Sequence, residues 1–271
     1  MEKSNNDELK RLEKQLSQNM ARIRSKILVL SNKGGVGKSS VSVNTAVSLS
    51  LSGKKTGLLD ADIHGPSVAK LLGFEGEKLI SSTGGFLPFR VKANLHAVSM
   101  ASVMENADTP VIWRGPLKMS VLRQFLAEVA WGDLDFMIID SPPGTGDEPL
   151  SICQLTGKLD GAIIVTTPQD VALLDSRKCV KFLEQLKVPV IGILENMSGF
   201  TCPHCGKQSN PFKTGGGEIS ARELGVPFLG KLPLDTRIME ASDSGTAFIE
   251  KYPEDASSDV INRICRSLPG F

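Results

Sequence analysis

The 271-residue sequence lacks any apolar run of roughly 18 to 20 residues, the length that a membrane-spanning helix needs. Residues 1–25 also lack the apolar core of a signal peptide; instead Leu9, Leu12 and Leu16 recur at helical spacing among Lys, Glu and Gln. We therefore expect a cytoplasmic protein without stable membrane association. Residues 1–25 are predicted to form an amphipathic helical extension.

The sequence also has no large excess of positive or negative charge. The chain has 31 Lys and Arg against 30 Asp and Glu, a net charge of +1, which argues against a nucleic-acid-binding surface as its main role. With 41% hydrophobic and 23% charged residues, the composition is that of an ordinary globular protein, long enough to bury a core. We expect no nucleic acid among its partners.

The cysteines do not form a disulfide framework. Five is an odd number, and the sequence carries no secretion signal, so free thiols or metal ligands are favoured. Cys153, Cys179 and Cys265 lie in apolar or helical surroundings and are expected to be small core residues. Cys202 and Cys205 form the one CxxC motif, and no second motif in the sequence completes a four-sulfur site.

The sequence has no internal repeat, but apolar, β-branched runs alternate with helical stretches. This alternation is typical of an α/β fold with a mostly parallel sheet flanked by helices, here a single domain over residues 26–271. Strands are expected at 26–30, 56–59, 95–100, 136–139, 162–166, 190–196 and 228–230. Helices are expected near 38–51, 117–129, 172–186, 217–224, 236–241 and 256–267. Residues 80–91 are expected to form a loop or small hairpin.

Residues 32–40 read Asn-Lys-Gly-Gly-Val-Gly-Lys-Ser-Ser and directly follow the apolar run 27–30. In a GxxxxGK[ST] loop the glycines turn backbone N–H groups toward a triphosphate, the lysine adds positive charge, and the hydroxyl binds Mg²⁺. Asn32 replaces the first glycine, which is tolerable because asparagine accepts a left-handed backbone. The residues expected to bind the nucleotide here are Lys33, Gly34, Gly35, Val36, Gly37, Lys38, Ser39 and Ser40.

The string KGGVGKS resembles the deviant phosphate loop of the MinD/ParA/Mrp class, the SIMIBI type of P-loop NTPase. In that class the extra lysine is thought to reach the partner's nucleotide across a dimer interface. The resemblance thus implies a nucleotide-dependent homodimer and catalytic roles for Lys33 and Lys38. The alternative for Lys33 is a solvated loop charge.

Carboxylates follow two of the expected strands. The segment LLDADIHGPS resembles that of the Mrp/ApbC branch, which implies that Asp62 positions the attacking water and that Asp60 acts near Mg²⁺ through water. Asp60 could instead merely cap the turn, with Asp62 solvated, while His64 is expected to pack within the loop. Asp140 ends a buried run, the arrangement that holds Mg²⁺ indirectly beside a phosphate loop, and is the expected Walker B residue.

Two further segments match the Mrp family. The string PPGTGD at 142–147 implies that Gly144 places its backbone N–H near the γ-phosphate in a switch, although two prolines and two glycines also suit a rigid turn. Asn196 matches the position expected to hydrogen-bond adenine, and otherwise it is a strand-end turn residue. Pro233 and Asp235 resemble the other loop beside the base.

Two chains meeting face to face would bring four thiolates of Cys202 and Cys205 around a twofold axis. The Mrp/ApbC resemblance implies the same arrangement, with a labile [4Fe–4S] cluster bridging the subunits and delivered to recipient apoproteins. Zinc in the same four-sulfur site is the alternative. His204 is expected to be a solvated spacer.

The preferred hypothesis is therefore a homodimer that binds and slowly hydrolyses ATP with Mg²⁺ and carries or assembles iron–sulfur clusters. The alternative is a positioning ATPase of the MinD/ParA kind, in which the same switch governs membrane or DNA attachment. Such a protein would need an attachment surface. The C-terminal stripe of Val260, Ile261, Ile264 and Leu268 is expected to face the core instead of a membrane. A metabolic ligase or reductase subunit with the same fold is a third class.

Overall fold

The computed structural model describes residues 2–82, 85–103, 115–169 and 172–271. Among them, eight strands form one sheet in the order β12-β9-β8-β1-β7-β2-β6-β5, parallel except for the edge strand β5. These strands are β1 (Ile23–Leu30), β2 (Thr56–Asp60), β5 (Phe89–Lys92), β6 (Leu95–Ser99), β7 (Leu134–Asp140), β8 (Gly161–Thr166), β9 (Val190–Glu195) and β12 (Phe228–Lys231). Two hairpins, β3 (Ile80–Ser82) with β4 (Gly85–Leu87) and β10 (Phe200–Thr201) with β11 (Gln208–Ser209), lie outside this sheet.

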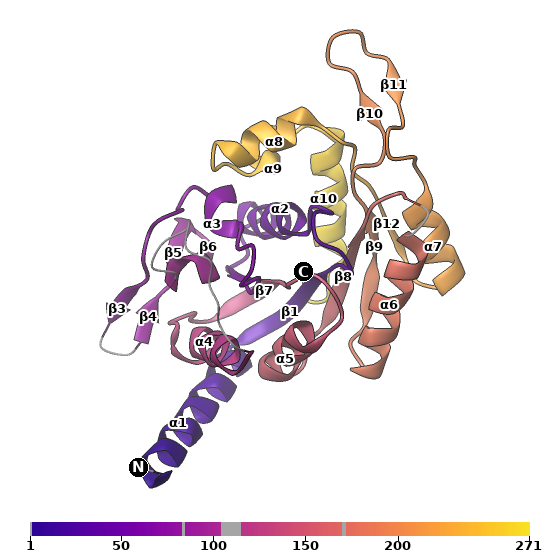
Figure 1. Ribbon diagram of the computed structural model, residues 1–271. Coiled ribbons are helices and arrows are strands. Elements are labelled where there is room, and N and C mark those ends of the chain that lie inside the picture. Colours follow the sequence, from indigo (N-terminus) through magenta and orange to yellow (C-terminus); the bar gives the residue numbers. More distant parts are fainter. Residues whose placement is uncertain (1, 83–84, 104–114, 170–171) are drawn as a thin grey trace.

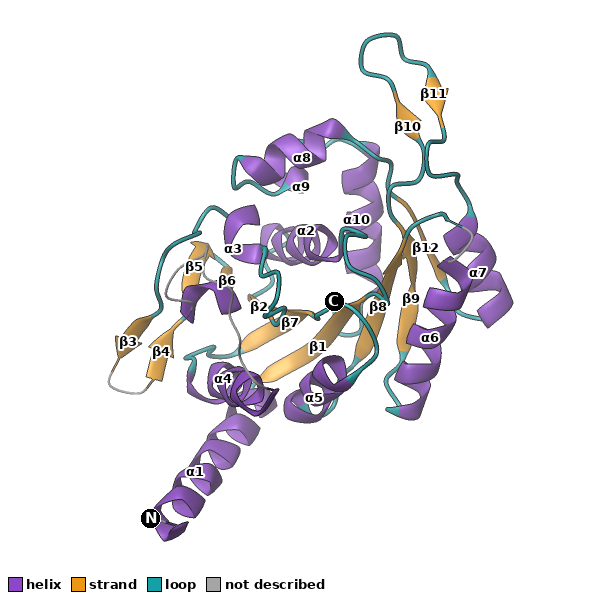
Figure 2. Ribbon diagram, in the orientation of Figure 1, coloured by secondary structure: helices purple, strands orange, loops and turns teal. Residues whose placement is uncertain are grey.

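Helices cover both faces of the sheet (Figure 2). One face carries α2 (Lys38–Leu51), α3 (Val68–Leu71), α8 (Thr236–Asp243), α9 (Phe248–Lys251) and α10 (Ala256–Ser267). The other carries α4 (Gly115–Glu128), α5 (Asp147–Thr156), α6 (Ala172–Gln185) and α7 (Gly216–Leu224). A 3₁₀ turn, η1 (Met100–Val103), follows β6.

The two faces of the sheet form two hydrophobic clusters, and the central strands supply both. In β1, Ile27 and Val29 pack with α2 and α10, whereas Leu28 and Leu30 pack with the helices of the opposite face. Successive side chains of a strand point to opposite faces, so a strand covered on both sides is apolar at every position. This explains why the expected strands appeared as continuous apolar runs.

The expected α/β architecture is confirmed, with local differences. β1 begins at Ile23, three residues before the expected start, because Ile23 and Ser25 already pair with β7 and are buried. The sequence predicted no helix between the strands that became β7 and β8, yet α5 begins at Asp147. Asp147 and Glu148 stabilise its first turn, where a proline is also tolerated. In the expected loop or hairpin region, β3 pairs with β4, and β5 joins the main sheet as an edge strand.

The C-terminal apolar stripe faces the core as expected. Val260, Ile261, Ile264 and Leu268 are all buried in the cluster that contains α2. Cys153, Cys179 and Cys265 are buried as well, which confirms them as core residues. In the described part of the chain, none of the helices is both long and apolar enough to cross a membrane.

The N-terminal helix α1 (Glu2–Ala21) extends from the body and meets it through its last turns (Figure 1). Met20 is buried in the core beneath α4. The side-chain amide of Asn19 lies 3.1, 2.8 and 3.2 Å from the backbone oxygens of Leu126, Ala127 and Val129 at the end of α4. The last carbonyls of a helix have no partner within the helix, so Asn19 caps α4 from another element.

Replacing Asn19 by alanine should leave the carbonyls of Leu126 and Ala127 without this donor and lower the free energy of unfolding by roughly 1 to 3 kcal/mol. The measurement is urea unfolding followed by circular dichroism. Gln18→Ala, at an exposed position of the same helix, is the control and should change stability by less than about 0.5 kcal/mol. Equal unfolding midpoints for the two variants would show that the Asn19 contacts do not stabilise the fold.

Candidate functional site

The phosphate loop lies between the end of β1 and the start of α2. Gly35 and Gly37 have positive φ angles of 77° and 84°, which L-residues with a side chain rarely adopt. The loop borders a cavity of about 590 Å³, within the range of ligand-binding pockets. Its walls include the predicted residues Lys33, Gly34, Gly35, Gly37, Lys38, Ser39, Ser40 and Asp62, together with His64, Pro143 and Met197. Val36 instead packs into the core.

Asp140, at the end of β7, binds the start of α2 through three donors. Its carboxylate accepts hydrogen bonds from Lys38 Nζ at 2.9 Å, Ser39 Oγ at 2.6 Å and Ser42 Oγ at 2.8 Å. Asp140 is fully buried, so the cation and the two hydroxyls offset the cost of removing its charge from water. The hydroxyl of Ser39 and the carboxylate of Asp140 are hard oxygen ligands that fit Mg²⁺.

Asp60, at the end of β2, is also fully buried and is Asp140's neighbour across the sheet. It accepts hydrogen bonds from Ser99 Oγ at 2.8 Å, from the backbone N–H of Val68 at 3.1 Å and from that of Asp62 at 3.2 Å. The pKa of Asp60 is raised to about 7. The larger cause is burial, and the second is the negative charge of Asp140. The three hydrogen bonds hold the Asp60 carboxylate at the end of β2.

Asp62 and Gly144 approach the phosphate loop from two other segments. Asp62 Oδ1 accepts hydrogen bonds from the backbone N–H groups of His64 at 3.1 Å and Gly65 at 3.2 Å, which fixes its side chain beside the cavity. The N–H of Gly144 donates to Ser31 O at 2.8 Å, so it would have to exchange this partner to meet a γ-phosphate.

Lys33 is held within its own chain. Its Nζ lies 3.0 Å from Asp175 Oδ2 in the first turn of α6, and the side chain of Asn32 donates to Asp175 Oδ1 at 2.7 Å. The Lys33 side chain is 49% exposed, so this ion pair contributes little, about 0 to 1 kcal/mol. Lys33 can therefore leave Asp175 at small cost.

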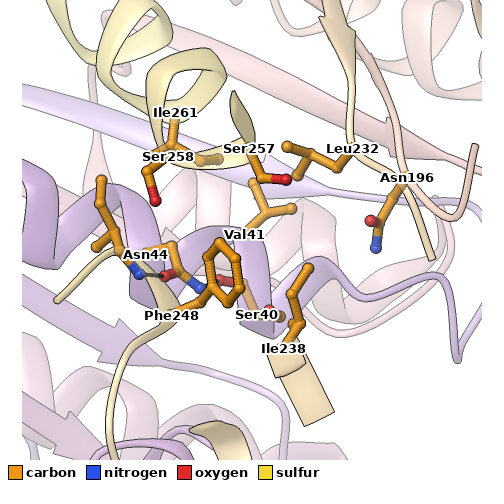
Figure 3. Close-up of a pocket in the computed structure, with 11 residues that line it drawn as sticks. Ser40, Val41, Asn44, Asn196, Leu232, Ile238, Phe248, Ser257, Ser258 and Ile261 are labelled. Carbon is orange, nitrogen blue, oxygen red and sulfur yellow. Dashed lines mark hydrogen bonds between the residues drawn. The ribbon is translucent and has the colours of Figure 1, made fainter. Parts of the chain in front are cut away.

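Asn196 contacts the phosphate loop from the end of β9. Its side-chain amide donates to Val36 O at 2.9 Å, and a Cβ at Gly37 would overlap its Nδ2 atom. Figure 3 shows Asn196 at one side of a small pocket whose other walls come from α2, α8, α9 and α10. The apolar side chains of Leu232, Ile238 and Phe248 face this pocket, which adjoins the phosphate loop at Ser40.

Pro233 and Asp235 line a different cavity, of about 480 Å³, next to the β10–β11 hairpin. Asp235 caps α8 by accepting from the N–H of Arg237 at 2.8 Å. The guanidinium of Arg237 bridges Asp235 and Asp255 at 2.6 and 2.7 Å. The structure does not bring Pro233 or Asp235 into the pocket that holds Asn196.

Cys202 and Cys205 lie in the loop of the β10–β11 hairpin, which projects from the body (Figure 1). Cys205 is exposed and Cys202 is half-buried. Backbone hydrogen bonds from Cys205 and His204 lower the pKa of the Cys202 thiol, which favours the thiolate that binds metals. Within the described residues, no group of three or more His, Cys, Asp or Glu side chains could hold a metal ion.

Sequence reasoning missed several residues of this site. Ser42 and Ser99 bind the buried carboxylates, Asp175 holds Lys33, and Glu195 binds the segment that carries the cysteines. Ser42 lies one turn after Lys38 and could have been found from helical spacing. Asp175 lies 142 residues from Lys33, and no local pattern connects them.

A loop of this form after the first strand of a central parallel sheet, with buried carboxylates at the ends of two neighbouring strands, defines a P-loop NTPase. Residues 22–269 match the ParA family model described as NUBPL iron-transfer P-loop NTPase. The chain belongs to this family.

Individual proteins that this chain resembles are consistent with that family. An iron-sulfur cluster carrier protein of Methanocaldococcus jannaschii is 47% identical over 94% of this chain and 89% of that protein. A cytosolic Fe-S cluster assembly factor NUBP2 homolog of Dictyostelium discoideum is 46% identical over 88% and 91% of the two chains. A nucleotide-binding protein of Archaeoglobus fulgidus, solved with ADP, is 36% identical, with a TM-score of 0.76 over 87% and 92%. The MinD ATPase of Pyrococcus furiosus, at 21% identity and a TM-score of 0.62, shares the fold.

The contact between Gly37 and Asn196 predicts an interaction between two substitutions. Gly37→Ala should lower the affinity for a fluorescent ATP analogue by about tenfold, because the methyl group would displace the Asn196 amide and strain the positive φ. In an Asn196→Ala background the same change should cost less, because the overlapping amide is gone.

Gly53→Ala controls for backbone strain, since Gly53 has a φ of 82° and open space at its Cβ. It should leave nucleotide affinity unchanged. An equal loss of affinity from Gly37→Ala in both backgrounds would refute the predicted interaction.

Proposed function

We propose that this chain is an ATP-hydrolysing carrier or scaffold that holds an iron–sulfur cluster between two subunits and transfers it to recipient apoproteins. The observation that carries the proposal is a pair of free thiols, Cys202 and Cys205, on a projecting hairpin of a chain that also contains a phosphate loop. The relatives named as iron–sulfur carriers and assembly factors support it. The name of the Dictyostelium discoideum relative, a cytosolic assembly factor, supports a cytoplasmic location.

In this proposal the nucleotide binds in the cavity of the phosphate loop. The backbone N–H groups of residues 34–40 and the ammonium of Lys38 bind the phosphates, and Asn196 lies beside the base. Ser39 and Asp140 hold Mg²⁺, which neutralises charge on the β- and γ-phosphates. To do so, Lys38 and Ser39 exchange their present hydrogen bonds to Asp140 for contacts with the ligands.

Hydrolysis requires an oriented water at the γ-phosphate. Asp62 is the residue proposed for this role, because it borders the cavity and two backbone N–H groups fix its carboxylate. Lys33 completes the site only when it leaves Asp175 and reaches the nucleotide of a second subunit. Such a site turns over slowly until the two subunits meet.

The cluster is cargo and needs ligands from both subunits. One chain offers the two thiols of Cys202 and Cys205, whereas cluster and zinc sites of this kind use four. The β10–β11 hairpin that carries both cysteines projects from the body, so a second hairpin can approach it (Figure 1). Homodimer formation around these loops completes a four-thiolate site, for which [4Fe–4S] is proposed and zinc is the alternative occupant.

The double variant Cys202→Ser and Cys205→Ser should lose nearly all cluster loading, because serine does not replace a soft thiolate ligand. Loading is measured as bound iron and sulfide, with the visible absorption spectrum, after anaerobic reconstitution. Cys153→Ser is the matched control, since its thiol is buried and should not take part. Full loading of the double variant would refute the proposed site. Zinc without iron in protein purified anaerobically would favour the alternative occupant.

Asp175→Asn should make ATP-dependent dimerisation easier, because it removes the carboxylate that holds Lys33 within its own chain. The Lys33 side chain is half exposed, so the concentration of ATP needed for half-maximal dimer should fall by at most about fivefold. Analytical ultracentrifugation at increasing ATP measures it. Lys33→Ala should abolish the ATP effect in either background, and an ATP-driven dimer of Lys33→Ala would contradict the assigned role.

A further inference from the structure

Glu195 is a buried carboxylate that none of the steps above uses. It ends β9 and is fully buried. Its Oε1 accepts a hydrogen bond from the N–H of Gly215 at 2.8 Å and one from the hydroxyl of Ser198, and its Oε2 accepts from the N–H of Gly217 at 2.6 Å. These donors offset the cost of burying a charge, which is large for an unpaired carboxylate.

The donors belong to the two ends of the segment that carries the cysteines. The chain leaves β9 after Glu195, forms the β10–β11 hairpin with Cys202 and Cys205, and returns at the start of α7. Ser198 lies on the outgoing side and Gly215 on the returning side, and Ser198 Oγ also lies 2.9 Å from Thr214 Oγ. Glu195 therefore closes the base of the projecting segment.

The glycines at this base fit the carboxylate closely. Gly215 caps α7 with a φ of 90°. A Cβ at Gly217 would lie 2.9 Å from Glu195 Cβ and 3.1 Å from Thr166 Cγ2. A Cβ at Gly216 would lie 2.6 Å from Pro168 O. Side chains at Gly216 and Gly217 would push α7 away from the strand ends, so these glycines allow the N–H groups to reach Glu195.

The next residue, Asn196, connects the same strand end to the nucleotide site. Its side chain donates to Val36 O in the phosphate loop, and Met197 lines the phosphate cavity. The backbone of β9 also binds its neighbour strands here, with Leu232 N–H donating to Glu195 O at 2.8 Å and Asn196 N–H donating to Thr166 O at 2.8 Å. A shift of the phosphate loop that moves Asn196 thus acts on a strand end firmly joined to Glu195.

We propose that Glu195 is a positioning residue that couples the phosphate loop to the cysteine hairpin, so that nucleotide binding changes how the two thiols are presented. The inference rests on the proposed function for the role of the thiols. A merely structural role would be that of an N-terminal cap of α7, which adds stability alone. The two roles differ in whether nucleotide still affects the cysteines when Glu195 is changed.

The experiment measures the alkylation rates of Cys202 and Cys205 by iodoacetamide, using the reduced, metal-free full chain with and without Mg²⁺ and ATP. Mass spectrometry follows each cysteine peptide, and the buried Cys153, Cys179 and Cys265 report on folding because they should stay unlabelled. In the unaltered chain ATP should change the rates by about fivefold or more. In Glu195→Gln the ratio of rates should fall close to one, with nucleotide affinity within about twofold of the unaltered chain.

Glutamine has the shape of glutamate, but its NH₂ group would face a backbone N–H and leave one donor unpaired. Glu218→Gln is the matched control. Glu218 lies in the first turn of α7, next to Gly217, and its carboxylate pairs with Lys231 at the surface. It should keep the full ATP effect. If labelling of the buried cysteines shows that Glu195→Gln is unfolded, Ser198→Ala replaces it, because it removes one donor and leaves both backbone contacts. Ser198→Ala should reduce the ATP effect in part.

An ATP effect of normal size in folded Glu195→Gln, or in Ser198→Ala where that variant replaces it, would overturn the inference. The absence of any ATP effect in the unaltered chain would overturn it too, while cluster loading by Cys202 and Cys205 could still support the proposed function. Conversely, an ATP effect that depends on Glu195 in a chain that loads no cluster would leave the coupling standing and refute the proposed cargo.

Discussion

The hydrogen bonds of Asp140 hold the phosphate loop to the centre of the sheet. Asp140 is fully buried, and its charge is stable there because Lys38, Ser39 and Ser42 all donate to it. Two of these donors, Lys38 and Ser39, are also the groups expected to bind phosphate and Mg²⁺. In the proposed function, nucleotide binding exchanges partners within this network, at the first turn of α2.

The parallel sheet determines what such an exchange can reach. The strands β2, β7 and β9 all run in the same direction. Their last residues, Asp60, Asp140 and Glu195, therefore lie along the side of the sheet formed by the carboxyl ends of the strands. Each carboxylate accepts backbone or side-chain donors from a loop that begins just beyond its strand or from a neighbouring element. This side of the sheet therefore joins elements that lie far apart in sequence, from α3, whose Val68 N–H donates to Asp60, to α7, whose Gly217 N–H donates to Glu195.

The parts of this site that depend on short motifs could be predicted from the sequence. Continuous apolar runs indicated the buried strands, and the glycines and lysines at 33–39 indicated the phosphate loop before any coordinates were known. The sequence did not predict α5, because Pro142, Pro143 and Gly146 favour turns directly before the helix begins. The contacts of Asp175 and Glu195 could not be predicted, since each joins elements whose approach is decided by packing.

The hairpin itself explains why its base needs a rigid support. Its ladder pairs two residues of β10 with two of β11, and an isolated two-stranded hairpin is marginally stable in water. A labile cluster shared by two such hairpins would be held by four thiolates on weakly ordered loops. The base of the hairpin is held more firmly than its tip. Ser198 donates to Glu195 at the end of β9, and the N–H of Leu234, just after β12, donates to the outgoing chain at Gly199 O. The geometry of the thiols is then controlled where the segment leaves the sheet, next to the residue that contacts the phosphate loop.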